Sequence, residues 1–192
     1  MKELNQYSEK ADALLWEKMI GGDKVAFEQL YRRYYSPLIS YALSLSFDEG
    51  FAKDCIQDLF IKIFLSKSLK PIIYVRAYLY RALRNSLLDR LSLVSDFQVI
   101  DDVVSDKCLV EDEELIRLFS EEDESLKQSK LLVNALNYLS DNQKNAIYLY
   151  YIKEFSWDEM AAALDINPHS CMNLVARSIV KLRKLVDLLE KK

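Results

Sequence analysis

The sequence predicts an all-α protein made of two small helical domains joined by an acidic linker. Only three glycines and three prolines occur among the 192 residues, whereas 51% of the residues are hydrophobic. This composition favours long helices around a substantial core over hairpins and a β-sandwich. Apolar residues recur at three- and four-residue steps in most segments, which is the period of an α-helix.

The net charge of −4 hides three blocks of different charge. Residues 1–92 hold 14 bases and 11 acids, and residues 126–192 hold 10 bases and 7 acids. Residues 93–125 hold 12 acids and 2 bases, and their hydrophobic periodicity is weak. We therefore expect a mildly basic domain at 1–92, an acidic flexible linker at 93–125 and a second mildly basic domain at 126–192.

Capping residues predict the first three helices of the first domain. A short helix at 14–20 is expected to end at Gly21–Gly22, after which Asp23 is a good N-cap for the next helix. Pro37 marks a kink or a break inside that second helix. Asp48 is expected to cap a third helix that runs to about Lys67.

The fourth helix is expected from Pro71 to Leu91, because proline suits a first helical turn. It carries two stripes, and the first is an apolar face suited to burial. The second stripe is basic and aromatic, and it comprises Arg76, Tyr80, Arg81, Arg84 and Asn85. Such a face can bind phosphate and stack on unpaired bases. The alternative interpretation is a solvated surface face.

The second domain ends in a helix-turn-helix pattern. Ser156 and Glu159 form a capping box for a helix that reaches Leu164, and Asn167 caps a final helix with Pro168 at its first position. Two helices joined by so short a turn are typical of DNA-binding proteins, although an ordinary helical hairpin is the alternative. The second helix would present its first residues to base edges in the major groove. These residues are His169, Ser170, Met172, Asn173 and Arg177.

No catalytic, cofactor or metal site is expected. Cys55, Cys108 and Cys171 lie far apart without metal-type spacing and are expected to be reduced thiols, and His169 is the single histidine. No phosphate-loop pattern follows Gly21–Gly22. The chain has no apolar run long enough to span a membrane, and its first residues lack the pattern of a signal peptide. A cytoplasmic protein is therefore expected.

Four segments, in order, resemble one protein family. AFEQLYRRYYSPLISYA, AKDCIQDLFIKIF and VRAYLYRALRNSLLDRL are similar to the conserved domain of bacterial extracytoplasmic-function (ECF) sigma factors of the sigma-70 family. The segment from Ala135 to Leu185 is similar to the C-terminal domain of the same family. The resemblance implies a subunit that directs RNA polymerase core to promoter DNA, without catalysis of its own.

The resemblance also implies roles for individual residues. The motif formed by Ala52, Asp54, Gln57, Asp58 and Phe60 implies docking on the clamp helices of the largest polymerase subunit, through Asp54, Gln57 and Asp58. These three side chains share a helix face for which we expect no intramolecular role. The motif Leu83, Arg84, Asn85 and Asp89 implies binding of the melted −10 element. Lys67 and Lys70 would contact phosphates there, and the strand would face Arg76, Tyr80, Arg81, Arg84 and Asn85.

The −35 element would be read as duplex by the last helix. Asn173 suits adenine, and His169 or Arg177 suits guanine or phosphate. Relatives often carry bases where this chain has Met172 and Leu174, and a glycine where it has Asp165. Aspartate tolerates left-handed backbone better than most residues.

Relatives are commonly held inactive by an anti-sigma protein, so such a partner is expected. Two other interpretations remain: a sigma-like protein that binds polymerase or an inhibitor without reading promoters, and a helical enzyme.

Overall fold

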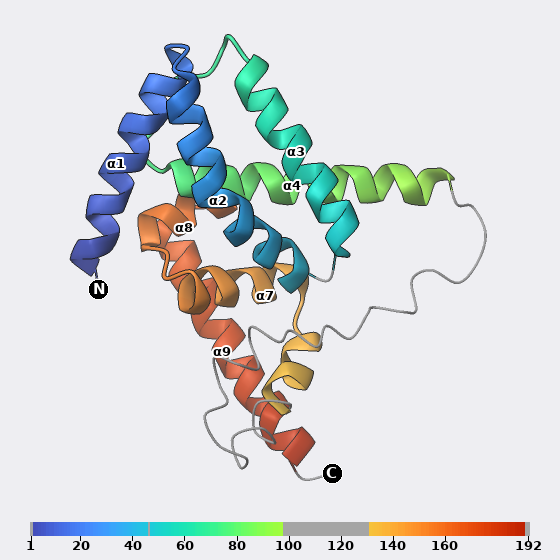
Figure 1. The fold of residues 1–192 in the computed structure, drawn as a ribbon. Coiled ribbons are helices and arrows are strands. Elements are labelled where there is room, and N and C mark those ends of the chain that lie inside the picture. The colour runs from blue at the N-terminus through green and yellow to red at the C-terminus, as the bar shows by residue number, and fades with distance from the viewer. Residues whose placement is uncertain (1, 46, 98–130, 191–192) are drawn as a thin grey trace, which may run out of the picture. The chain divides into compact units, whose positions relative to one another are not determined.

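The structure, a computed structural model, describes residues 2–45, 47–97 and 131–190 (Figure 1). These residues form helices joined by turns and loops, and they contain no strand. The predicted all-α class is therefore confirmed. Contacts divide the chain into two compact units, one comprising Met1–Ala42 and Phe47–Asp101, the other Leu43–Ser46 and Asp102–Lys192. The finer boundaries at 92 and 126 stay a prediction, and most of the acidic linker lies outside the described residues.

Four helices build the first unit: α1 (Lys2–Ile20), α2 (Lys24–Ser44), α3 (Glu49–Leu65) and α4 (Val75–Phe97). The turn between α1 and α2 needs Gly22, whose φ of 97° lies in the left-handed region. The Asp23 carboxylate accepts hydrogen bonds from the backbone N–H groups of Val25 and Ala26, and thus caps α2 as predicted. The Asp48 carboxylate likewise caps α3, by accepting from the N–H of Phe51.

Helix α2 continues through Pro37, so of the two alternatives predicted there, a kink or a break, the break is excluded. Three other predicted helix ends in this unit are wrong. α1 begins at Lys2 rather than at residue 14. α4 begins at Val75, so Pro71 belongs to a loop, and it continues past Leu91 to Phe97. No glycine or proline follows Leu91 in this stretch, so the sequence offers no local signal that ends the helix there.

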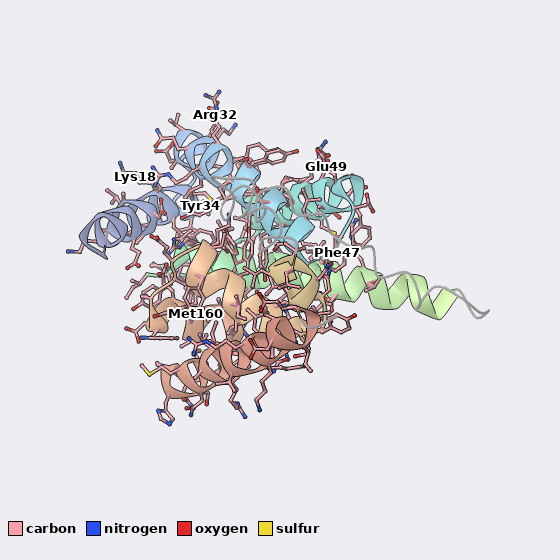
Figure 2. All side chains as sticks on the ribbon, turned by 90° about the horizontal axis from the view of Figure 1, so that it is seen from below. Lys18, Arg32, Tyr34, Phe47, Glu49 and Met160 are labelled. Carbon is pink, nitrogen blue, oxygen red and sulfur yellow. The ribbon has the colours of Figure 1, made fainter. Side chains whose placement is uncertain are left out.

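The core of the first unit is formed by apolar faces of all four helices, and α4 packs against α1 and α3. Its largest fully buried side chains are Trp16, Leu30, Leu38, Tyr41, Ile56, Leu79, Tyr80, Leu83 and Leu87. One buried carboxylate, Asp12, accepts hydrogen bonds from Arg33 and Tyr34 of α2 and so ties α1 to α2. Figure 2 shows that Arg32, the residue before Arg33, projects outward instead, and it pairs there with Glu28.

The second unit contains a helical segment at 131–137, then α7 (Asp141–Ile147), a π-helical turn (Tyr148–Ile152), α8 (Trp157–Leu164) and α9 (Pro168–Glu190). Both α7 and α8 pack against α9. One cluster of buried residues connects the helical segment at 131–137 and α7 with α9. It comprises Ala135, Leu139, Ile147 and Leu182. The capping box of Ser156 and Glu159 is present as predicted, with Glu159 fully buried.

Cys55 and Cys171 are free, fully buried thiols, one in each unit. Burial raises the pKa of both thiols, which keeps them protonated and unreactive at neutral pH. Cys108 lies outside the described residues.

Candidate polymerase and nucleic-acid interfaces

The outward face of α3 carries the three residues predicted to dock on polymerase. Asp54 and Gln57 are exposed, and Asp58 is partly exposed. Asp58 also forms an ion pair with Arg90 of α4. The expectation that this face has no intramolecular role is therefore wrong for Asp58, because its carboxylate helps to join α3 to α4. Arg90 lies 32 residues away in the sequence, so helical spacing within α3 gave no sign of this pair.

A pocket lies between α3 and α4, beside the predicted −10 residues. Its volume is about 300 Å³, which is the lower end of the range for small-ligand pockets. Apolar atoms come from both helices and from the loop between them, and the polar groups include Asn85 of α4 and Lys62 of α3. The lining residues are Leu59, Lys62, Ile63, Ser66, Leu69, Tyr78, Ala82, Asn85, Ser86 and Asp89. The lining is of mixed polarity, with polar side chains from both helices beside the apolar ones.

Most of this pocket was not predicted, although the sequence holds a signal for it. Tyr78, Ala82, Asn85 and Asp89 follow one another at steps of three and four residues, so they form a stripe along α4. Leu59, Lys62, Ile63 and Ser66 likewise share one side at the end of α3 and its C-cap, because they lie at positions i, i+3, i+4 and i+7. Two such stripes of mixed polarity predict a lined groove only when the two helices are known to be adjacent. Burial raises the pKa of Tyr78, so its hydroxyl stays neutral beside the pocket.

Of the predicted −10 residues, Asn85 alone is among those that line the pocket. Lys67 and Lys70 are exposed in the loop between α3 and α4, and Asn85 is exposed on α4. Arg76, Arg81 and Arg84 are partly exposed and each makes an intramolecular interaction.

Tyr80 is the exception among these residues, because only 2% of it is exposed. Its ring packs on Tyr41 at a centroid distance of 4.7 Å, and its hydroxyl lies 3.4 Å from the carbonyl oxygen of Pro37. The prediction that Tyr80 faces the DNA strand is therefore wrong in this structure. Tyr80 belongs to the core, together with Leu79 and Leu83 of the same helix.

The helix-turn-helix is formed by α8, a turn at 165–167 and α9. The carboxamide oxygen of Asn167 accepts a hydrogen bond of 2.8 Å from the N–H of Ser170, so it caps α9 as predicted. Asp165 ends α8 with φ 59° and ψ 39°. The chain therefore adopts the left-handed conformation at this position without a glycine.

The start of α9 exposes most of the residues predicted to read duplex DNA. His169, Asn173 and Arg177 are exposed, Met172 is 41% exposed and Ser170 is partly exposed. The guanidinium Nε of Arg177 donates a hydrogen bond to the carbonyl oxygen of Asn173, which holds the arginine along the helix. These side chains follow one another on the first turns of the helix, where a recognition helix contacts bases.

Among the described residues, no group of three or more potential metal-ligating side chains lies together. Within the same ranges, no helix combines the length and the apolar character that crossing a bilayer requires.

The fold and these surfaces define a two-part helical protein in which a basic, pocketed unit accompanies a helix-turn-helix. Comparison with known families gives two matches: sigma-70 region 2 over residues 30–97, and sigma-70 region 4 over residues 129–182. The chain belongs to the sigma-70 family and is an RNA polymerase sigma factor of the ECF type.

Individual relatives agree with this assignment. The ECF RNA polymerase sigma factor SigM of Bacillus subtilis (strain 168) is 20% identical over 168 residues, which cover 85% of this chain and 96% of SigM. Two solved structures share the fold, each at 24% identity. CnrH in complex with the cytosolic domain of CnrY matches with a TM-score of 0.64, over 93% of this chain and 98% of CnrH. The sigma factor RpoE in complex with the anti-sigma factor NepR, from Bartonella quintana, matches with a TM-score of 0.58, over 84% and 96%.

Proposed function

We propose that this sigma factor captures a base of the melted −10 strand in the pocket between α3 and α4. The observation that carries the proposal is the position of Asn85, which lines the pocket and belongs to the stretch predicted to bind the −10 element. Lys67 and Lys70 stand on the adjoining loop, where they can neutralise phosphates of the strand. Arg84 precedes Asn85 on α4 and adds positive charge to this helix.

Two further surfaces complete the proposed function. Asp54, Gln57 and Asp58 dock on the clamp helices of the largest polymerase subunit, and the first turns of α9 read the −35 element as duplex. Asn173 and Arg177 are the side chains there with the strongest capacity for base or phosphate contacts. Binding and melting of DNA, rather than a chemical step, are the contribution of this chain, and it acts in the cytoplasm.

In vitro transcription with core polymerase from the source organism tests this function. Genomic fragments are transcribed with and without the protein, and the start sites are mapped. We expect discrete new start sites, and we expect a variant carrying Arg84→Ala and Asn85→Ala to lose them while it still binds polymerase. The matched control carries Gln29→Ala and Arg32→Ala on the outward side of α2, and it should transcribe normally. Polymerase binding without new start sites would contradict the proposal and favour a sigma-like protein that does not initiate.

The expected regulatory partner is an anti-sigma protein. The structural relative RpoE was solved with the anti-sigma factor NepR, and CnrH was solved with the cytosolic domain of CnrY. By analogy, we propose that a protein of this kind holds this chain away from polymerase. A candidate from the source organism should compete with core polymerase for the purified chain, and coexistence of all three in one stable complex would contradict this role.

A further inference from the structure

Trp16 of α1 contacts Tyr78, which lines the α3–α4 pocket, and Lys70, whose neighbour Leu69 also lines it. Its side chain is 1% exposed, and its indole Nε1 donates a hydrogen bond of 3.0 Å to the carbonyl oxygen of Lys70. Its ring meets the ring of Tyr78 edge to face, with the centroids 5.1 Å apart. Tyr78 lines the pocket, and so does Leu69, the neighbour of Lys70. One buried side chain therefore contacts both the loop before α4 and Tyr78 in the first turn of α4.

The loop that carries Lys70 has little regular structure of its own. Residues 66–74 form no helix or strand, and Pro71 has no N–H to donate. A segment of this kind is positioned largely by contacts with neighbouring elements. The indole N–H of Trp16 supplies such a contact, across 54 residues of sequence. The loop at Lys70 is thereby held where Leu69 can close the pocket.

The helix that carries Trp16 is itself anchored. Asp12 lies one turn before Trp16 on α1, and its buried carboxylate binds Arg33 and Tyr34 of α2. An anchored α1 gives the indole a fixed position, since successive turns of one helix move together. Interactions therefore run from α2 through Asp12 and Trp16 to the loop and Tyr78.

We propose that Trp16 is a positioning residue for capture of the −10 strand. The inference rests on the proposed function of the pocket and assigns to α1 a part in it. Trp16 does not touch DNA. Its hydrogen bond keeps the loop in the arrangement that accepts a base, so the apparent affinity for the strand depends on the fraction of molecules in that arrangement.

The first test replaces Trp16→Phe, which removes the N–H and retains an aromatic ring against Tyr78. The probe is a single-stranded oligonucleotide with the non-template −10 sequence from the mapped start sites, and the protein is tested as holoenzyme. Because a typical hydrogen bond is lost, we expect the dissociation constant of the holoenzyme for the oligonucleotide to rise about three- to tenfold. Affinity for core polymerase should stay within about twofold, because the docking face of α3 is untouched.

The matched control is Trp157→Phe, which makes the same chemical change in the second unit. Trp157 lies in the second unit, where its ring stacks on that of Tyr150 with the centroids 4.3 Å apart, and it is not among the residues that line the α3–α4 pocket. The control should bind the oligonucleotide normally. Equal affinities for the native chain and Trp16→Phe would overturn the positioning role and leave the proposed function intact. Failure of native holoenzyme to bind the oligonucleotide would instead overturn the function, and the positioning role with it.

A second measurement leaves the indole N–H in place and therefore does not depend on a variant at position 16. The chain holds only two tryptophans, so Trp157→Phe leaves Trp16 as its single indole. Incorporated as 5-hydroxytryptophan, this residue can be excited selectively in the presence of unlabelled polymerase. Saturation with the −10 oligonucleotide should change its emission, and a scrambled oligonucleotide should not. Unchanged emission at saturation would overturn the inference.

Discussion

Replacing Asp12→Ala should strongly destabilise the first unit. The Asp12 side chain is buried, and it accepts hydrogen bonds from Tyr34, itself buried, and from Arg33, which is 43% exposed. Burial, followed by the neighbouring carboxylate of Asp12, raises the pKa of Tyr34. The hydroxyl therefore stays protonated and needs an acceptor. Alanine at position 12 leaves that hydroxyl buried without its partner.

The magnitude follows from the two partners of Asp12. A buried donor without an acceptor costs about 1–3 kcal/mol, whereas the half-exposed guanidinium of Arg33 can turn to water and adds little. We expect a loss of about 2 kcal/mol in the free energy of unfolding. For a unit of roughly 100 residues this lowers the Tm by about 8–16 °C.

The assay is thermal and urea unfolding followed by tryptophan emission. In the Trp157→Phe background, emission reports only Trp16 and therefore only the first unit. Adding Tyr34→Phe to Asp12→Ala should recover about 1 kcal/mol or more, because phenylalanine needs no acceptor. The matched control is Glu17→Ala, an exposed acid on the same helix, which should stay within about 0.5 kcal/mol of the parent chain. An Asp12→Ala variant as stable as this control would refute the reasoning.

Three other predictions concern backbone strain, capping and pH. Glu154 and Asp165 adopt φ of 51° and 59°. Replacing either with glycine should raise the free energy of unfolding of the second unit by up to about 1 kcal/mol, and its Tm slightly with it. A lower Tm in calorimetry would contradict the strain. Asp48→Ala should cost about 1 kcal/mol, measured by urea unfolding, whereas Asp48→Asn should retain most of the cap. The raised pKa of Tyr34 stabilises the folded form below pH ~10, the ordinary tyrosine value, and this contribution is lost as the pH rises further. Tyr34→Phe should therefore flatten the fall in Tm above pH ~10, and an unchanged slope would contradict this linkage.

Helix starts were predictable where local chemistry determines them. Asp23, Asp48, Ser156 and Asn167 each satisfy backbone N–H groups two or three residues away, so the signal and its effect lie within one turn. The same locality explains the correct position of the turn before α9. Caps of this kind can be predicted without knowing the rest of the structure.

The start of α4 was missed because a distant contact overrides local preference. Pro71 suits a first helical turn, but the preceding carbonyl of Lys70 is bound by Trp16 of α1. Residues 66–74 form a loop, and α4 begins at Val75. No pattern near Pro71 reveals that partner.

The candidate site was predictable in its charges and not in its shape. The arginines of α4 and the lysines of the loop carry the basic character that the sequence indicates. Tyr80 shares their spacing but packs on Tyr41, because an aromatic ring at a helical step suits a core equally well. The pocket itself depends on how α3 and α4 meet, which the spacing within either helix does not determine.

Each unit contains one buried thiol whose labelling rate can report how often that unit opens. Cys55 lies in α3 and Cys171 in α9, and neither can meet a thiol reagent until its surroundings open. With Cys108 replaced by serine, the two labelling rates would measure the local opening of each unit separately within one intact chain. Added polymerase, promoter DNA or an inhibitory protein would slow one rate, the other or both, and so reveal which unit each partner stabilises.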